Sequence, residues 1–228
     1  MLGAGYGDEQ ALCLGERFAL VRAQTREGHR VVIKSVRADR ADVRSGEQLE
    51  REYELLSALN VAGVVKPLAF EVRAGRPAMV LDDAGPRSVA QLLTGGRLEV
   101  GRFLELSVQM AAILARIHAK NVIHRDVCPA NFVLDDAGFV TLVDFGIAAR
   151  PVGLAPPPGD PQGTLQYLAP ELVGRVKRGV DARSDLYSLG ATFYEMLTGT
   201  PPFPLSDPLE IVHAHLARIP LPPAKRTS

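Results

Sequence analysis

Two kinds of hydrophobic pattern divide the chain. Up to about residue 83 the apolar residues come in short runs, at 18–23, 30–36, 64–72 and 77–82. Short runs rich in β-branched residues are typical of strands, so this part is predicted to be β-rich. Residues 47–60 are the exception, because their apolar positions recur at helical spacing and predict a helix.

From residue 88 onward the pattern becomes mostly helical. Residues 100–120 carry an apolar stripe at 3.6-residue spacing, and 185–197 and 207–217 also predict helices. Two short apolar runs, 132–134 and 140–143, flank D-D-A-G-F and predict a hairpin. The expected fold is therefore α+β, with a small β-rich lobe at 1–84 and a mostly helical lobe at 85–228.

Composition narrows the class of protein. The 228 residues are 46% hydrophobic and 23% charged, as in an ordinary globular protein. Lys plus Arg and Asp plus Glu both number 26, and this neutrality argues against a nucleic-acid binder that works by bulk attraction to phosphate. No apolar run is long enough for a membrane span, and the first residues lack a signal-peptide pattern. Two cysteines exclude a disulfide scaffold, and a cytoplasmic location is expected.

Lys34 and Glu52 are the first candidate pair. In a strand Lys34 shares a face with Val32 and Val36, and Glu52 falls on the apolar stripe of the following helix. A partly buried amine and a partly buried carboxylate would stabilise each other. The alternative is that Lys34 extends to water and Glu52 lies at the edge of its stripe.

The segment V-I-H-R-D-V-C-P-A-N, residues 122–131, gathers polar side chains between apolar ones. Pro129 excludes a helix interior, so the segment is predicted to be a loop. If Asp135 pairs with Val140 in the hairpin, Asn131 lies opposite Asp144. An amide oxygen beside a carboxylate suits Mg²⁺, although Asn and Asp also commonly end strands.

The order of several motifs resembles a protein kinase of the eukaryotic-like (Hanks-type) Ser/Thr family. The matching segments are V-V-I-K, Glu52 on the next helix, H-R-D-x-x-P-x-N, D-F-G (144–146), G-T-x-x-Y-x-A-P-E (163–171) and S-D-L-Y-S-L-G (184–190). Six segments in register make coincidence negligible. The later segments resemble the kinase domains that open large bacterial sensor proteins, in which an AAA-type ATPase, a GAF domain and a histidine kinase come next.

The resemblance implies a bilobal fold, ATP and Mg²⁺ as cofactors, and a protein with Ser or Thr as substrate. It implies that Lys34, anchored by Glu52, holds the α- and β-phosphates, and that Asp126 accepts the proton of the attacking hydroxyl. Asn131 and Asp144 would bind Mg²⁺. Thr164 would line the substrate groove, Asp185 would hold the catalytic loop, and His124 would be a buried scaffold residue. The residues expected around the nucleotide are Gly15, Val21, Val32, Leu81, Asp82 and Ala84.

The chain also departs from the family. The phosphate-covering loop has one glycine, Gly15, and Cys128 stands where the family usually has a lysine. Residues 147–163 contain no Ser, Thr or Tyr, so we expect Asp160 or the prolines at 156–158 to order this segment in place of a phosphorylated residue. The helical lobe is expected to lack its last helices, which leaves Arg226 as the one candidate partner for Glu171.

Three functions remain open at this point. A Ser/Thr protein kinase is favoured by the five retained residues Lys34, Glu52, Asp126, Asn131 and Asp144. A pseudokinase, a nucleotide-binding module that regulates other domains of a longer chain, is favoured by Cys128 and the glycine-poor loop. A small-molecule kinase is disfavoured because those relatives generally lack the G-T-x-x-Y-x-A-P-E segment. We expect no chemistry from Cys13, which is predicted to precede the first strand, or from His213 and His215, which are predicted to be solvated.

Overall fold

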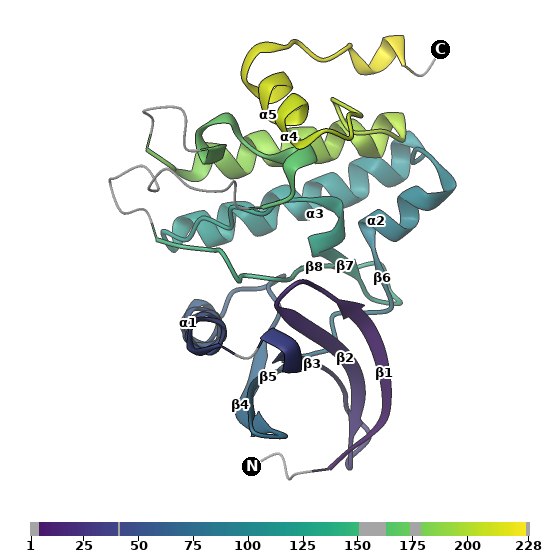
Figure 1. The fold of residues 1–228 in the computed structure, drawn as a ribbon. Helices are drawn as coiled ribbons and strands as arrows, with labels where there is room; N and C mark the ends of the chain where they lie inside the picture. Colours follow the sequence, from purple (N-terminus) through teal and green to yellow (C-terminus); the bar gives the residue numbers. More distant parts are fainter. Residues whose placement is uncertain (1–4, 41, 151–162, 174–178, 227–228) are drawn as a thin grey trace. The chain divides into compact units, whose positions relative to one another are not determined.

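The computed structural model describes residues 5–40, 42–150, 163–173 and 179–226. The chain divides into two units (Figure 1). The N-terminal unit comprises residues 1–60 and 64–84, and the C-terminal unit comprises residues 61–63 and 85–228. The short segment 61–63 therefore belongs to the C-terminal unit although it lies within the N-terminal part of the sequence.

The N-terminal unit is an antiparallel sheet of five strands in the order β1-β2-β3-β5-β4. The strands are β1 (Tyr6–Leu14), β2 (Phe18–Thr25), β3 (Arg30–Val36), β4 (Pro67–Arg73) and β5 (Arg76–Asp82). One face of the sheet is closed by a small apolar cluster of Ala23, Val31, Ile33, Ala78 and Val80. The predicted strands are present, and the sheet has one more than the sequence pattern indicated.

The additional strand is β1, which contains no alternation of apolar and polar residues. Eight of its nine residues are exposed, and it is an edge strand whose pairing with β2 is interrupted by register shifts. A strand with no buried face leaves no periodic signal in the sequence. Cys13 lies inside β1, so the expectation that it precedes the first strand is wrong.

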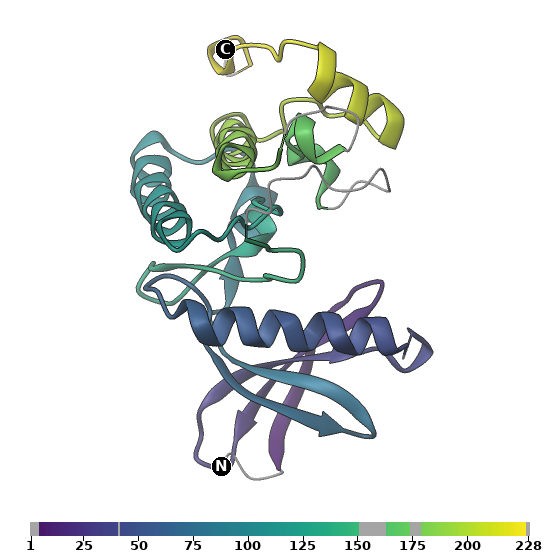
Figure 2. The ribbon, with the colours of Figure 1, turned by 90° about the vertical axis from the view of Figure 1, so that its left-hand side faces the viewer.

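Helix α1 (Val43–Leu59) packs on the other face of this sheet, and Figure 2 shows it beside the strands and at an angle to them. It begins four residues before the predicted start, because the Asp42 side chain accepts a hydrogen bond from the Ser45 N–H at 2.6 Å and caps the helix. Its buried residues include Leu49, Glu52 and Leu56. The face turned toward the sheet therefore carries a carboxylate among leucines.

The C-terminal unit is mostly helical. Its helices are α2 (Val89–Leu92), α3 (Val100–Ala119), α4 (Ala182–Thr198) and α5 (Pro208–Ala217), and its short strands β6 (Arg87–Ser88), β7 (Phe132–Leu134) and β8 (Val140–Leu142) form one sheet. Short 3-10 turns at Pro129–Asn131, Leu165–Tyr167 and Pro170–Val173 lie between these elements. In the described part of the chain no helix has the length and apolar character needed to cross a membrane.

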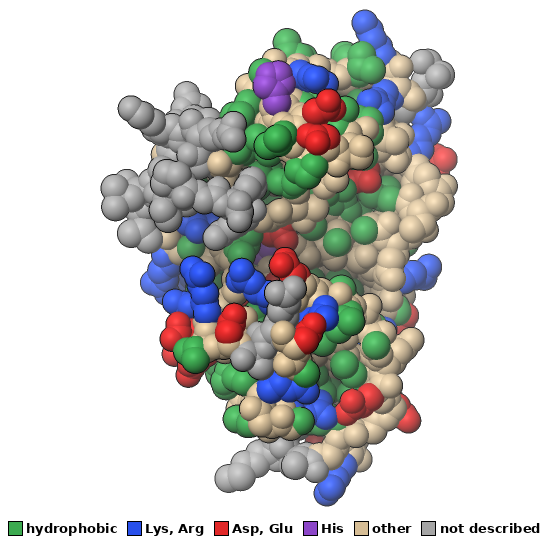
Figure 3. Space-filling view, viewed as in Figure 1, with side chains coloured by type: hydrophobic (Ala, Val, Ile, Leu, Met, Phe, Trp, Pro, Cys, Tyr) green, Lys and Arg blue, Asp and Glu red, His purple; other side chains and the backbone are tan. Residues whose placement is uncertain are grey.

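The core of this unit is built on the predicted stripe of α3. Leu106, Met110, Ile113, Leu114 and Ile117 are all buried at 2% exposure or less. Burying large aliphatic side chains of this kind stabilises a fold by about 1.5–3 kcal/mol each. Charged side chains of both signs are interspersed over the face of the molecule in Figure 3.

One of the two histidines of α5 is buried, although both were expected to be solvated. His213 is exposed as expected, but His215 is buried. Its Nδ1 forms a hydrogen bond with the Tyr187 hydroxyl at 2.8 Å, and its ring packs edge-on against the Phe203 ring. Burial lowers the pKa of His215. The hydrophobic pattern contained no sign of this, because the side chain is covered by residues distant along the chain.

Candidate active site

Lys34 and Glu52 form a buried ion pair in the N-terminal unit. The Lys34 ammonium lies 2.9 Å from Glu52 Oε1 and 2.7 Å from Oε2, and the two side chains are 4% and 1% exposed. The ammonium also lies 5.1 Å from the centre of the Phe18 ring. The alternative in which Lys34 extends to water is therefore wrong. Because β3 presents Lys34 to α1, the pair joins the sheet to its helix.

The strand register decides which side chains share the Lys34 face. Val32 pairs with Leu81 of β5, and Leu20 of β2 pairs with Lys34. Directly paired residues project to the same face, and neighbours along a strand alternate. Val21 pairs with Ile33 and so projects to the opposite face from Val32. Val21 and Val32, both expected around the nucleotide, therefore project to opposite faces of the sheet, and Leu20 shares the face of Val32 and Lys34.

The connection between β1 and β2, residues 15–17, is a tight turn. The Gly15 N–H donates to the Phe18 carbonyl at 3.0 Å, and the Gly15 carbonyl accepts from the Arg37 guanidinium at 2.8 Å. These bonds hold Gly15 in a closed turn rather than in an extended glycine-rich loop. A turn this short offers few backbone N–H groups to a phosphate.

The end of β5 supplies the other residues expected at the nucleotide. Leu81 is buried, Asp82 is exposed and Ala84 is partly exposed. Between them, Asp83 has a side chain only 3% exposed and pairs with Arg22 at 2.9 Å. The Arg22–Asp83 pair escaped the sequence analysis, because neither residue lies in a motif and only the register of β2 brings Arg22 there.

Asp126 is held from two sides in the C-terminal unit. Its Oδ1 accepts from the backbone N–H and the hydroxyl of Thr164 at 2.8 and 2.9 Å, and its Oδ2 accepts from Asn131 Nδ2 at 3.0 Å. The same Asn131 nitrogen also donates to the Asp126 carbonyl at 2.8 Å. Thr164 therefore lies beside Asp126, as predicted, and the orientation of the carboxylate is fixed by neutral donors.

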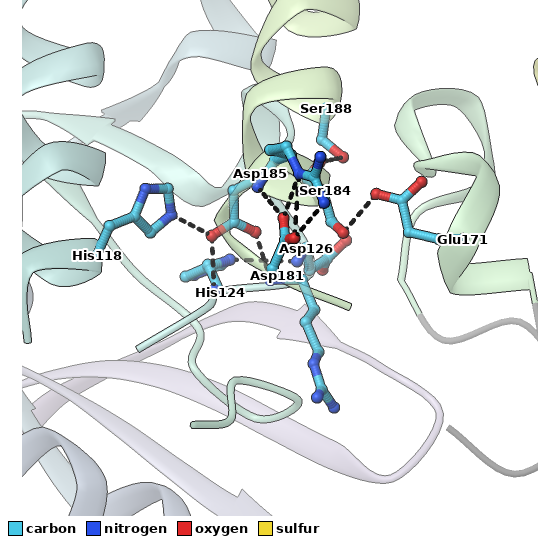
Figure 4. A network of polar contacts seen from close by, with 10 residues as sticks. His118, His124, Asp126, Glu171, Asp181, Ser184, Asp185 and Ser188 are labelled. Carbon is cyan, nitrogen blue, oxygen red and sulfur yellow. Dashed lines mark hydrogen bonds and ion pairs between the residues drawn. The ribbon is translucent and has the colours of Figure 1, made fainter. Parts of the chain in front are cut away.

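Asp185 of α4 holds the backbone of the loop that carries Asp126, and Figure 4 shows this network. Its fully buried carboxylate accepts from the backbone N–H groups of His124 and Arg125, each at 2.8 Å. His118 Nε2 lies 2.8 Å from the same carboxylate. Arg125 adopts a left-handed φ of 67°, a strained conformation that these hydrogen bonds offset. The role predicted for Asp185 is confirmed by this geometry, whereas His118 was missed.

His124 is a fully buried connector. Its Nε2 lies 3.1 Å from the Val143 carbonyl, and its Nδ1 accepts from the Asp126 N–H at 3.3 Å. The ring also packs edge-on against Phe145 at 4.6 Å between centroids. His124 thus ties the loop of Asp126 to the segment that carries Asp144, which is the scaffold position expected for it.

The hairpin register differs by one residue from the prediction. Phe132 pairs with Leu142, and the Val143 N–H donates to the Asn131 carbonyl at 2.9 Å, so Val143 rather than Asp144 lies opposite Asn131. The cause is the turn: the Asp135 carboxylate accepts from the N–H groups of Ala137 and Phe139, which closes a loop one residue shorter than assumed. Asp144 follows with a φ of 61° and an exposed carboxylate.

The oxygen atoms of Asn131 and Asp144 still fit a hard divalent cation. Both hydrogen bonds of the Asn131 amide use its nitrogen, which leaves the amide oxygen for another partner. In the described residues no three His, Cys, Asp or Glu side chains are grouped to hold a metal ion. A cation held by one amide and one carboxylate would need water and phosphate oxygens as further ligands, as is typical of Mg²⁺.

Cys128 is buried at 2% exposure beside Asp126. Burial and the nearby Asp126 carboxylate raise the pKa of the thiol to about 12, and the Thr164 hydroxyl lies 3.7 Å from Sγ. The thiol is therefore neutral at physiological pH. It cannot supply the positive charge that a lysine would bring to this position.

The partner of Glu171 is Ser184, whereas Arg226 was considered from the sequence. Its carboxylate accepts from the Ser184 hydroxyl at 2.5 Å, whereas Arg226 donates to Thr200 at 2.7 Å. Arg226, the one candidate partner named from the sequence, therefore does not pair with Glu171, because the chain after α5 leads Arg226 to the end of α4. Nearby, the Tyr167 hydroxyl bonds to Glu195, and burial with this carboxylate raises the pKa of Tyr167. The expectation about Asp160 and residues 156–158 lies outside the described residues.

Comparison with known proteins decides the family. Residues 12–225 match the family described as "Protein kinase domain". The chain belongs to the protein kinase domain family. Among its relatives are Serine/threonine-protein kinase pkn2 of Myxococcus xanthus, 34% identical over 96% of this chain and 26% of that protein, and Serine/threonine-protein kinase PknB of Mycobacterium leprae, 35% identical over 86% of this chain and 32% of that protein.

A more distant relative comes from a eukaryote. MAP kinase kinase kinase wis4 of Schizosaccharomyces pombe is 32% identical over 77% of this chain and 13% of that protein. This kinase domain spans about a quarter to a third of the length of its bacterial relatives. The fold class is confirmed: a β-sheet N-terminal unit and a helical C-terminal unit, α+β overall.

Proposed function

We propose that this kinase domain transfers the γ-phosphoryl group of ATP to a Ser or Thr hydroxyl of a protein. The observation that supports the proposal most directly is the Asp126 carboxylate, which Thr164 and Asn131 orient through uncharged donor groups. A carboxylate oriented in this way can accept a proton from a hydroxyl placed against it.

The N-terminal unit supplies the phosphate contact in this proposal. Lys34 binds the α- and β-phosphates, and Glu52 holds the ammonium in one position by contacts to both of its carboxylate oxygens. Leu20, Val32 and Leu81 offer apolar surface to the base, and Asp82 and Ala84 offer backbone groups. The tight turn at Gly15 places its backbone near the phosphates in this proposal.

The C-terminal unit supplies the reacting groups. Asp126 orients the attacking hydroxyl and takes up its proton, while Thr164 and Asn131 keep the carboxylate in place. Asn131 and Asp144 would hold Mg²⁺ by their oxygen atoms. When bound, this ion neutralises charge on the transferring phosphoryl group.

The proposal extends to the setting of the domain. Because its bacterial relatives are three to four times longer than their match to this chain, we infer that it works within a larger signalling protein. Sensor and ATPase domains of the AAA, GAF and histidine-kinase types are the neighbouring domains that the resemblance suggests. We infer a cytoplasmic location, because the proposed reaction needs ATP and because both cysteines are free.

A pseudokinase is the second candidate, and two observations favour it. The turn at Gly15 is short, and Cys128 presents a buried neutral thiol in place of a cation. Removing one preorganised charge of this kind costs about 2.7–4 kcal/mol of transition-state stabilisation, by analogy with a lost oxyanion donor. Such a domain would bind nucleotide but transfer phosphate slowly or not at all.

One pair of measurements separates the two candidates. Label transfer from radiolabelled ATP to a basic protein and to the chain itself is measured beside a thermal-shift titration with ATP and Mg²⁺. A kinase transfers label, and Asp126→Asn lowers the rate by about 10²–10⁴-fold. Asp136→Asn, at an exposed position of the hairpin turn, is the matched control and leaves the rate unchanged. Thermal stabilisation without label transfer would identify a pseudokinase.

A further inference from the structure

The outer face of α3 carries a continuous apolar stripe. Val100, Leu104 and Val108 are 62%, 54% and 69% exposed, and further along the same helix the exposed positions include three alanines. These six residues recur three or four positions apart and so form one line along the helix. The α3 stripe comprises Val100, Leu104, Val108, Ala111, Ala115 and Ala119. Figure 2 shows α3, in teal, along one margin of the C-terminal unit.

This stripe is unusual for a helix whose opposite side is already a core face. A surface helix normally carries polar and charged residues on its solvent side. Here a line of apolar residues also runs along the solvent side of α3, and three of them, Val100, Leu104 and Val108, are large enough to gain by burial. Exposed apolar surface arranged continuously in this way commonly marks an interaction site.

Side-chain size is distributed unevenly along the α3 stripe. Its large residues, Val100, Leu104 and Val108, occupy the first half, and its alanines occupy the second half. If a second α3 lay antiparallel on the first, each large side chain would face an alanine of the other copy. A parallel arrangement would place large residues against large ones. Size complementarity therefore favours an antiparallel copy of the same helix.

Two charges at the edge of the α3 stripe favour the same arrangement. Glu105 and Arg116 are separated by about three helical turns, so they lie on the same edge of the helix. A twofold axis passing between Met110 and Ala111 would bring Glu105 of each copy opposite Arg116 of the other. Both side chains are exposed: Glu105 pairs locally with Arg102 at 3.0 Å, and Arg116 donates to the Ala62 carbonyl at 3.4 Å.

We propose that the α3 stripe is a self-association surface, on which α3 of a second copy of this chain packs antiparallel. The contact is isologous, because the same residues serve on both sides of the axis. One helix pair buries less than the about 1,600 Å² of a standard interface, so the dimer is expected to be weak and concentration-dependent. The α3 stripe includes none of the candidate site residues Lys34, Asp126 and Asp144.

Charge substitutions test the surface in solution. Light scattering over a concentration series is expected to show a mass rising toward twice 24.5 kDa. Val108→Glu should leave the chain monomeric, whereas Val72→Glu, equally exposed on β4, should not change the mass. Glu105→Arg and Arg116→Glu should each weaken the dimer, and the double variant should restore it. A monomer at every concentration, or a dimer indifferent to Val108→Glu, overturns the proposal.

Cross-linking tests the position of the axis. In a Cys13→Ser background, which removes the one exposed cysteine, Ala111→Cys should form a disulfide-linked dimer under mild oxidation, because residue 111 lies next to the axis. Glu210→Cys, exposed on α5, is the control and should stay monomeric. Equal cross-linking of both variants overturns the arrangement. Thermal melting of each variant confirms that it is folded.

Discussion

Thr164 and Asp126 are joined by two hydrogen bonds that end on the same carboxylate oxygen. The Thr164 backbone N–H and hydroxyl lie 2.8 and 2.9 Å from Asp126 Oδ1. Gly163 makes this approach possible: its φ is 108°, and a Cβ there would lie 3.0 Å from the Arg125 carbonyl oxygen. The segment that begins at Gly163 therefore determines the direction in which Asp126 points.

We predict that Thr164→Val lowers the rate of phosphoryl transfer while the KM for ATP stays the same. Valine keeps the shape and the backbone N–H but removes the hydroxyl. A hydrogen bond to a charged group contributes about 1.5–3 kcal/mol, which corresponds to a rate loss of about tenfold or more. Thr164→Ser keeps the hydroxyl and should retain most of the activity. Steady-state label transfer measures both, and an unimpaired Thr164→Val would show that the hydroxyl has no part in orienting Asp126.

The buried Lys34–Glu52 pair predicts that losing one partner strongly destabilises the N-terminal unit, and that replacing both partners restores most of the stability. Glu52→Gln leaves the Lys34 ammonium buried without its charged partner, and breaking such a pair costs about 3–5 kcal/mol of unfolding free energy. The double variant Lys34→Met/Glu52→Leu should recover most of that loss, because it buries no charge. Urea unfolding measures the differences.

Glu47→Gln serves as the control for this series. Glu47 is an exposed residue of the same helix and pairs with Arg51 at 3.7 Å, so its loss should change stability by about 0.5 kcal/mol or less. If Glu52→Gln were no more harmful than Glu47→Gln, the buried pair would have no special role in the unit.

Cys128 should resist alkylation in the folded protein. A thiol with a pKa of about 12 is ionised in about one molecule in ten thousand at pH 8, and only the thiolate reacts. Iodoacetamide at pH 8 is therefore expected to label the exposed Cys13 alone, and to label both cysteines in denaturant. Mass spectrometry of the digested chain reports each site. Similar labelling rates at the two sites in the native state would contradict the burial of Cys128.

Because burial lowers the pKa of His215, we predict that the protein is less stable in mild acid. Burial lowers its pKa below the value of about 6.5 in the unfolded chain, so below pH 6.5 the unfolded chain binds more protons. The free energy of unfolding should thus be constant above pH 6.5 with respect to this group and fall as the pH drops below it. Urea unfolding should therefore give a lower free energy of unfolding at pH 5.5 than at pH 7.5.

Two variants isolate that contribution. His215→Phe removes the titrating ring and should flatten this part of the pH dependence, at some cost in stability because the Tyr187 hydroxyl loses its partner. His213→Gln, at the exposed neighbour on α5, should leave the pH dependence unchanged. Identical pH profiles for the natural chain and His215→Phe would show that another group causes the acid sensitivity.

The hydrophobic pattern predicted most elements, because it reports which face of a helix or strand is buried. The stripe of α3 that faces the core is an example: of its six predicted residues, Phe103 is partly exposed and the other five are buried as expected. The same rule explains the omission of β1, which is an edge strand with almost no buried residue. The start of α1 was misplaced because the capping side chain of Asp42, rather than an apolar residue, begins the helix.

The geometry among the candidate site residues could not be predicted from the motifs alone. The motifs indicated Lys34, Glu52, Asp126, Asn131 and Asp144, but the register between Asn131 and Asp144 was wrong by one residue because the Asp135 turn is shorter than assumed. Val21 and Val32 were both expected around the nucleotide but project to opposite faces of the sheet, because the pairing of β2 with β3 decides which side chains share a face. Side-chain direction changes completely with a shift of one residue.

The amino-acid sequence by itself determined most of the elements, the family and the candidate site residues, because local periodicity and motif spacing are properties of neighbouring positions. Only the tertiary structure decided that Lys34 is paired rather than solvated, that His118 and Asp185 meet, and that His215 is buried. Each of these depends on residues far apart in the chain, and burial and hydrogen bonding arise only when packing brings such residues together.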